Sequence, residues 1–123
     1  MRKESNRPLR VAELIKRELA VLMPQVLNDA RAHQTTITHV DVSPDLKNAR
    51  VYFTLLAGTA GAEPVLKMFS HAAGHLRRAL AGRLRLRVVP ALRFYFDESV
   101  ERGDRLAQLI DRAVSEDAAG KKL

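Results

Sequence analysis

The sequence predicts a single α+β domain in which helices cover a three-stranded sheet. Two observations support this class. Apolar residues recur at three- and four-residue spacing near the N-terminus and in the middle of the chain, which is typical of amphipathic helices, and three shorter runs alternate apolar and polar residues, which is typical of strands. The predicted order is helix, strand, strand, helix, helix, strand. A chain of 123 residues suits one domain with its own core. We expect this domain to span residues 1–114, with a loose tail at 115–123.

The first helix is expected over residues 8–28. Pro8 suits the first helical turn because its missing N–H needs no partner there. Pro24 is expected to kink the helix or to end its regular part. The polar residues that follow, 29–35, are expected to form a loop. The apolar stripe of this helix consists of Val11, Ile15, Leu19, Leu22 and Val26.

Residues 36–43 and 49–56 predict an antiparallel hairpin, because the turn-forming residues Pro44, Asp45 and Asn48 lie between them. A third strand is expected over residues 87–96, where Pro90 marks an edge, a bulge or the beginning of the strand. Strict alternation places one set of side chains on each face. One face would carry Thr38, Val40, Val42, Val51, Phe53, Leu55, Leu92, Phe94 and Phe96. The other would carry Ile37, His39, Asp41, Arg50, Tyr52, Thr54, Arg93 and Tyr95.

The middle of the chain predicts two helices that meet at the small residues Ala72-Ala73-Gly74. Pro64 opens the first helix, and Gly74 can adopt a positive φ and act as its C-cap. Gly82 would end the second helix in the same way. The alternative is a regular helix that runs through Gly74 at a cost of about 1 kcal/mol relative to alanine. A short final helix is expected over residues 102–114.

Charge indicates a polyanionic partner. The formal net charge is +7, and residues 74–93 hold six arginines and no acidic residue. Residues 1–17 hold six basic and two acidic residues, whereas the chain from Asp97 onward is slightly acidic. Such polarity gives a one-sided positive field that attracts nucleic acid. The alternative is a basic protein whose charges are merely solvated.

We therefore expect an RNA-binding site at the helix joint and on the basic face beside it. A helix N-terminus just after Gly74 would direct free N–H groups at a phosphate, and arginine side chains would offer bidentate contacts. The primary site comprises Lys67, His71, Ala73, Gly74, His75, Arg77, Arg78, Arg83, Arg85 and Arg87. A secondary patch on the first helix comprises Arg7, Arg10 and Arg17. A plain helix terminus and solvated arginines would also explain these residues. Tyr52 and Tyr95 lie where bases could stack, but we interpret them as ordinary surface tyrosines.

Other functions find little support in the sequence. The absence of cysteine excludes disulfides and thiolate metal sites. His71 and His75 are spaced like a helical metal pair, but the glutamate of the H-E-x-x-H motif is missing. No phosphate-binding or dinucleotide-binding glycine motif occurs. We expect no cofactor and no enzymatic activity. Without a secretory signal or an apolar run of about 20 residues, we expect a cytoplasmic protein that does not enter the membrane.

The element order resembles the type II KH domain, which binds single-stranded nucleic acid with a GxxG loop between two helices. Here Ala72-Ala73-Gly74 replaces that loop, and the departure resembles the ribosome-binding factor A family, whose members join the two helices with a kinked Ala-x-Gly. Further stretches resemble the same family. They are RPLRV at residues 7–11, DAR at 29–31 in place of Asp-Pro-Arg, SPDLKNARVY at 43–52 and LRVVPALRFYFD at 86–97.

The resemblance implies an assembly factor of the bacterial small ribosomal subunit. Such a factor binds the free, immature 30S subunit through 16S rRNA, promotes late maturation and 5′-end processing, supports growth in the cold, and leaves with the help of assembly GTPases. We expect a monomer. The missing GxxG loop favours recognition of RNA shape and backbone over a short base sequence. The alternative from another class is a protein–protein adaptor whose basic face meets an acidic partner.

Overall fold

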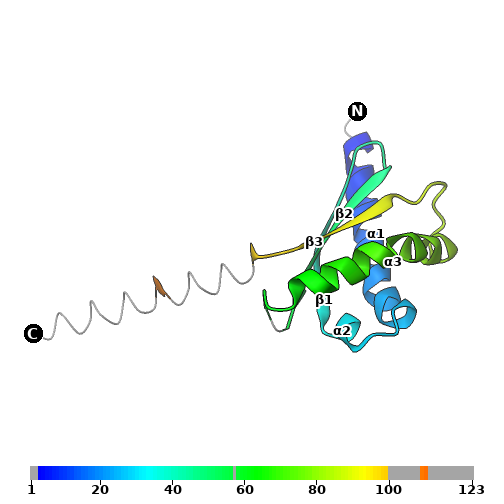
Figure 1. Cartoon of the computed structure of the whole chain (residues 1–123). Coiled ribbons are helices and arrows are strands. Elements are labelled where there is room, and N and C mark those ends of the chain that lie inside the picture. The colour runs from blue at the N-terminus through cyan, green and yellow to red at the C-terminus, as the bar shows by residue number, and fades with distance from the viewer. Residues whose placement is uncertain (1–2, 57, 100–108, 111–123) are drawn as a thin grey trace, which may run out of the picture.

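Six helices and strands form in the part of the chain that this computed structural model describes, which is residues 3–56, 58–99 and 109–110. Their order is helix, short helix, strand, strand, helix, strand (Figure 1). The elements are α1 (Lys3–Val26), α2 (Ala30–His33), β1 (Thr35–Val42), β2 (Asn48–Leu55), α3 (Ala62–Arg83) and β3 (Ala91–Phe96).

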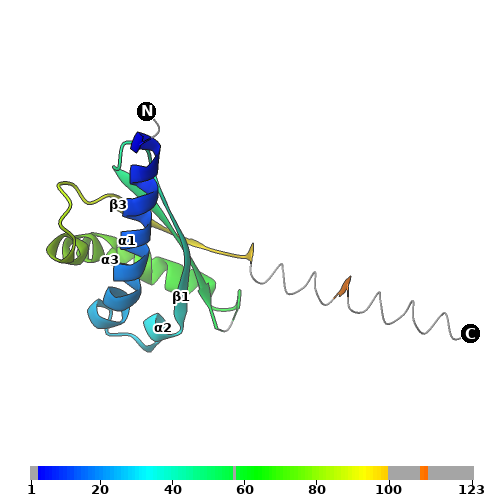
Figure 2. The ribbon, with the colours of Figure 1, turned by 180° about the vertical axis from the view of Figure 1, so that it is seen from behind.

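The three strands form one sheet in the order β1-β2-β3. β1 pairs antiparallel to β2, and β3 pairs parallel to β2 after the crossover through α3. Helix α1 packs on β1, α3 packs on β3, and the two helices contact each other on the same side of the sheet (Figures 1 and 2). The predicted α+β architecture with a helix-covered three-stranded sheet is confirmed.

The core lies between the sheet and the two long helices. Ile15 and Leu19 of α1, and Phe69 of α3, are fully buried. Phe53 of β2 contacts Phe69 edge-to-face with ring centroids 5.1 Å apart, an arrangement that adds to the area the two rings bury. No charged or polar residue among the described ones is buried, so the charges must be sought on the surface.

β1 departs from strict alternation at Thr38. The pairing register shifts between Ile37 and His39, which is the signature of a bulge that leaves one extra residue in the strand. Ile37 therefore turns to the core side with Val40 and is only 9% exposed. The prediction that Ile37 faces outward was wrong, because a bulge reverses the alternation on one side of it. The Thr38 hydroxyl instead donates a 2.5 Å hydrogen bond to the Asp97 carboxylate.

Helix α3 is continuous from Ala62 to Arg83, although two helices were predicted. Among the described residues, the glycines with positive φ are Gly58 and Gly61, and Gly74 keeps helical backbone angles. The predicted break at Ala72-Ala73-Gly74 and the predicted end at Gly82 were therefore wrong, although the helix axis bends partway along (Figures 1 and 2). A glycine inside a helix costs only about 1 kcal/mol. The buried side chains on both sides of Gly74 outweigh that cost. They are Val65, Phe69, Leu76 and Leu80.

The bounds of α1 differ from the predicted ones at both ends. The helix begins at Lys3, so Pro8 lies inside it and does not mark its first turn. Pro24 also lies within α1, close to its end, where it removes one helical hydrogen bond without ending the helix.

Other boundaries differ by a few residues. The loop predicted after α1 contains the short helix α2, which Asp29 caps by accepting from the Arg31 backbone N–H at 2.9 Å. β3 begins directly after Pro90, one of the three positions predicted for that proline. The helix predicted at residues 102–114 and the tail lie outside the described residues, except for Leu109 and Ile110, which are helical.

Candidate nucleic-acid interface

The outer face of α3 carries an exposed stripe that includes four basic or histidine residues of the predicted site. They recur at three- or four-residue spacing, opposite the side that packs on the sheet. This α3 face consists of Lys67, His71, His75 and Arg78, all of them exposed. Glu63, in the first turn, is the acidic residue of α3, and no acidic residue follows it until Asp97. Glu63 precedes Lys67 by one helical turn, so the part of the stripe from His71 to Arg78 presents positive charge without an acidic neighbour on its own helix.

Gly74 also lies within this stripe and adds no side chain to it. A Cβ added there would meet nothing closer than Nη1 of Arg78, at 3.9 Å. The Arg78 guanidinium thus lies over the glycine. The helix N-terminus that we expected just after Gly74 does not exist, because the backbone N–H groups there belong to a continuous helix. Any phosphate at this position would therefore be held by side chains.

Arg77 lies on the flank of α3 rather than on its outer face. Its Nε donates a 2.9 Å hydrogen bond to the backbone carbonyl of Val89. This bond ties α3 to the segment that leads into β3. Arg77 therefore has a structural contact that its neighbour Arg78 lacks among the described residues.

Arg83 forms an ion pair between the two long helices. Its Nε lies 2.5 Å from Oε1 of Glu18 on α1, so part of its charge is balanced by a carboxylate. Arg85 and Arg87 are exposed, but they precede β3 instead of alternating along it. The third strand, which we expected from residue 87, begins only at Ala91.

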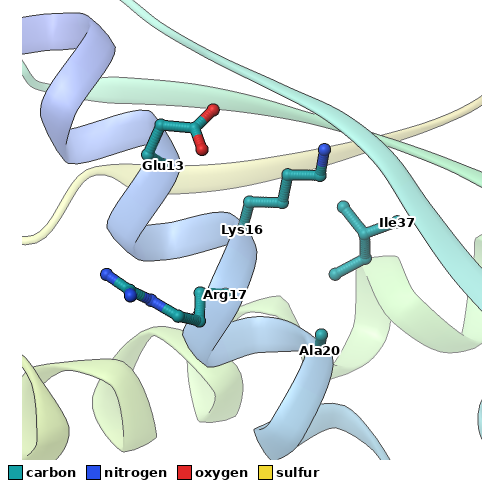
Figure 3. A pocket seen from close by; sticks show the side chains of 5 residues that line it. All are labelled: Glu13, Lys16, Arg17, Ala20 and Ile37. Carbon is teal, nitrogen blue, oxygen red and sulfur yellow. The ribbon is translucent and has the colours of Figure 1, made fainter.

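The secondary patch lies on α1. Arg7, Arg10 and Arg17 are exposed there, with Glu13 among them. A shallow pocket beside this patch is lined by Glu13, Lys16, Arg17, Ala20 and Ile37 (Figure 3). Lys16 extends toward the side that carries Ile37, whereas the Arg17 guanidinium points the other way (Figure 3). The mixed charge and divergent side chains of this pocket contrast with the α3 face, whose four residues include no acidic one.

A groove that the sequence did not reveal follows β3. It is lined by Ser70, Ala73, Leu92, Arg93, Phe94 and Tyr95. Because β3 is an edge strand, the groove lies between α3 and the unpaired side of the sheet. Ala73 is the predicted site residue that it contains, and its small side chain leaves the groove open. Pro90, three residues before Arg93, was the available signal, since proline in a strand region indicates an edge.

The strongest carboxylate contacts do not involve the α3 face. Hydrogen bonds from the Arg31 side chain, with help from its backbone N–H, lower the pKa of Asp29 to about 2. Hydrogen bonds from Ser43 and from the Lys47 backbone lower the pKa of Asp45. Ser99 and then Thr38 lower the pKa of Asp97 in the same way. These acids remain ionised at neutral pH. Each interacts with a partner near it, and none of them forms an ion pair with Lys67 or Arg78.

Neither a metal centre nor a membrane span is found in the part of the chain that the structure describes. No group of three or more histidine and acidic side chains there could hold a metal ion, so His71 and His75 lack a third ligand. None of the described helices is long and apolar enough to cross a membrane.

Comparison with known proteins decides the family. The sequence model of ribosome-binding factor A matches residues 7–110. The chain belongs to the ribosome-binding factor A family. Ribosome-binding factor A of Nitrosococcus oceani is 44% identical over 98% of this chain and 95% of its own length. That of Nitrosomonas europaea is 47% identical over 93% of this chain and 97% of its own length.

Solved structures of ribosome-binding factor A share the fold. The crystal structure from Thermus thermophilus superposes with a TM-score of 0.64 at 32% identity, covering 75% of this chain and 97% of that one. A homology model of the Thermus thermophilus protein, fitted into a cryo-EM map of its complex with the 30S subunit, gives a TM-score of 0.58 at 34% identity. It covers 69% of this chain and 89% of that one. The predicted KH-like single-domain class is thereby confirmed.

Proposed function

We propose that this protein is an RNA-binding assembly factor that docks on the free 30S subunit through 16S rRNA. The observation that carries the proposal is the α3 face, where Lys67, His71 and Arg78 project from one helix with no acidic partner among the described residues. Membership of the ribosome-binding factor A family supports the same partner. A family member fitted into a map of a 30S complex supports the choice of subunit.

The α3 face would bind the RNA backbone through side chains. A guanidinium such as that of Arg78 can hold two phosphate oxygens at once, and Lys67 can add a point charge. Each phosphate neutralised releases condensed counterions, so affinity should fall steeply as salt rises. Because α3 has no break at Gly74 and no GxxG loop, the four-nucleotide KH clamp is not available. Recognition would then depend on the shape of folded RNA.

The remaining predicted residues have different parts in this proposal. Arg85 and Arg87, next to the C-terminal end of α3, would extend the backbone contacts. Arg77 and Arg83 would support the surface through Val89 and Glu18, and their remaining N–H groups would face the RNA. Arg7, Arg10 and Arg17 would form a second, weaker contact.

The biological role would follow from binding alone. A protein that binds one conformation of the immature subunit more tightly than others shifts the RNA toward that conformation. This would promote late maturation and 5′-end processing of 16S rRNA, with the largest benefit in the cold. Assembly GTPases would then aid release. We propose a monomer that acts in the cytoplasm and has no enzymatic activity.

Sedimentation with purified free 30S subunits tests the proposal. The bound fraction is measured over a series of salt concentrations, and hydroxyl-radical footprinting on 16S rRNA is done at the lowest one. We expect a steep linear fall of log affinity with log salt and a protected stretch of rRNA. A shallow salt dependence without any rRNA protection would support the protein–protein adaptor instead.

A further inference from the structure

The sheet face opposite the helices carries a row of three aromatic rings. His39, Tyr52 and Tyr95 come from β1, β2 and β3, and each is the register partner of the next. The His39 and Tyr52 ring centroids are 5.9 Å apart. Those of Tyr52 and Tyr95 are 5.4 Å apart, with the rings stacked at 27° to each other. The three strands thus build one row of rings that crosses the sheet, stacked between Tyr52 and Tyr95 and tilted at 37° between His39 and Tyr52. We call this row the ring stack.

The stack ends at an open edge. β3 is the last strand of the sheet, so no further strand of the described chain lies beyond Tyr95. Tyr95 is 37% exposed, whereas Tyr52 is half-buried between its two neighbours. A flat ring from another molecule can therefore extend the stack only at its ends, and Tyr95 is the end that opens into the groove beside α3.

Positive charge lies in the adjoining row. Arg50 and Arg93 are register partners on the same face. Arg50 lies 3.7 Å from the Asp41 carboxylate, but Arg93 has no acidic partner among the described residues. Arg93 lines the same groove as Tyr95, together with Ser70 and Ala73 of α3. A single groove thus contains one end of the ring stack, the unpaired guanidinium of Arg93, and the small residues Ser70 and Ala73 of α3.

The composition of this face favours a nucleic acid over a protein. Of the large apolar or aromatic residues exposed in the described chain, Tyr95 alone lies on the sheet face. The others lie on α1, as Leu9 and Val21 do, near a strand end, as Leu56 and Val88 do, or in the helical pair Leu109 and Ile110. Protein interfaces have an apolar centre, whereas single-stranded nucleic acid is held by aromatic rings beside cationic side chains. The rings and Arg93 match the second pattern.

We propose that Tyr95 is a stacking site for an unpaired RNA base, with Arg93 holding the adjacent phosphate and Tyr52 and His39 supporting the ring from behind. This deepens the proposed function, on which the choice of RNA rests. The α3 face would contact the RNA backbone on one side of the groove, and Tyr95 would contact single-stranded RNA on the other. The two tyrosines, which the sequence presents as ordinary surface residues, thereby acquire a shared role.

The chain supplies its own probe for this test. It has two tyrosines and no tryptophan, so tyrosine fluorescence reports on the ring stack alone. An eight-nucleotide single-stranded oligouridylate is titrated into the full-length protein, and its affinity is measured separately by the anisotropy of a labelled copy. We expect saturable quenching of the tyrosine emission. Y95L should weaken binding roughly 5- to 100-fold, whereas Y95F should stay within about twofold, since stacking needs the ring and not the hydroxyl.

Val21→Ala is the matched control, since Val21 is similarly exposed at 43% but lies on α1; it should bind as the wild type does. Because Tyr95 is exposed, Y95L should fold, which circular dichroism checks. The loss caused by Y95L should be nearly the same in low and moderate salt, since stacking releases no counterions. The proposal is overturned if Y95L binds the oligonucleotide as tightly as the wild type, or if tyrosine emission does not change.

These outcomes are separable from failure of the proposed function. If Y95L leaves oligonucleotide affinity unchanged while R78E abolishes binding to 30S subunits, the stacking site is wrong and the α3 face stands. If Y95L weakens the oligonucleotide while R78E leaves subunit binding intact, the stacking site stands and the α3 face is wrong.

Discussion

Arg77 and Val89 are joined by a hydrogen bond of 2.9 Å from the guanidinium Nε to the backbone carbonyl oxygen. The next residue, Arg78, lies over Gly74 instead and contacts no described carboxylate. Two adjacent arginines that are indistinguishable in the sequence thus differ in what they do. Arg77 fixes the segment before β3, and Arg78 presents charge to the outside.

The first prediction separates these two arginines by stability. Arg77→Ala should lower the free energy of unfolding by about 1 kcal/mol, because the carbonyl of Val89 loses its donor in a partly buried position. Arg78→Ala should change it by less than about 0.5 kcal/mol, as expected for an exposed side chain without partners. Urea denaturation of the two variants measures both values. Equal losses of unfolding free energy in the two variants would mean that the hydrogen bond to Val89 does not stabilise the fold.

The second prediction concerns Gly74. Because it has helical backbone angles and open space around its Cβ position, Gly74→Ala should raise the free energy of unfolding by up to about 1 kcal/mol. Gly82→Ala, also inside α3 with nothing within 4 Å, is the control and should gain less because it lies next to the helix end. Thermal unfolding gives the comparison. A loss of stability in Gly74→Ala alone would indicate a backbone conformation at the bend that alanine cannot adopt.

The third prediction concerns the ion pair between α1 and α3. In a double-mutant cycle with Glu18→Gln and Arg83→Gln, the coupling free energy should be about 0.2–1 kcal/mol and should shrink in high salt, because both side chains are partly exposed. Denaturation at two salt concentrations measures it. A coupling free energy of zero would mean that Glu18 does not hold Arg83, whose full charge would then be available to RNA.

The fourth prediction is a pH dependence. Hydrogen bonds from Ser99 and Thr38 lower the pKa of Asp97 below its ordinary 3.8. The folded state therefore favours the carboxylate more than the unfolded chain does. The resulting stability is present at neutral pH and is lost as the pH falls below 3.8 through the lowered folded value. Asp97→Asn should be less stable than the wild type by up to about 1 kcal/mol at pH 7.

The difference between Asp97→Asn and the wild type should then narrow as the pH falls below 3.8, because protonation of Asp97 removes the charge that its hydrogen bonds stabilise. Denaturation curves at neutral pH and at about pH 2.5 provide the comparison. Thr38→Val, which removes one of the donors, should show the same narrowing to a smaller degree. A difference that stays constant with pH would mean that the bonds do not depend on the charge of Asp97.

The local sequence pattern was enough to predict most of the helices and strands, but not the bulge in β1 or the continuity of α3. The apolar stripe of α1 and the alternation of β2 are visible in the sequence because each spans many residues of one period. The bulge at Thr38 could not be foreseen, since a single extra residue leaves no trace in composition. The continuity of α3 was equally hidden, because the burial of Phe69 and Leu76 on either side of Gly74 is a tertiary effect that overrides the glycine.

The candidate site divides in the same way. Helical spacing sufficed to place Lys67, His71 and Arg78 on one face. The partners of Arg77 and Arg83 come from residues 12 and 65 positions away, so the sequence could not show that these arginines were engaged. The ring stack required the pairing of all three strands, and the outward positions of Tyr52 and Tyr95 gave only a hint of it.

The measurement that tests the central claim most directly is sedimentation of R78E with purified free 30S subunits across a salt series. Lys47→Glu is the control, because it makes the same charge change at an exposed lysine in the β1–β2 turn. We predict that R78E binds more weakly than the wild type with a salt slope smaller by about one, and that Lys47→Glu behaves as the wild type. Equal binding and equal slopes for R78E and the wild type would contradict RNA binding by the α3 face.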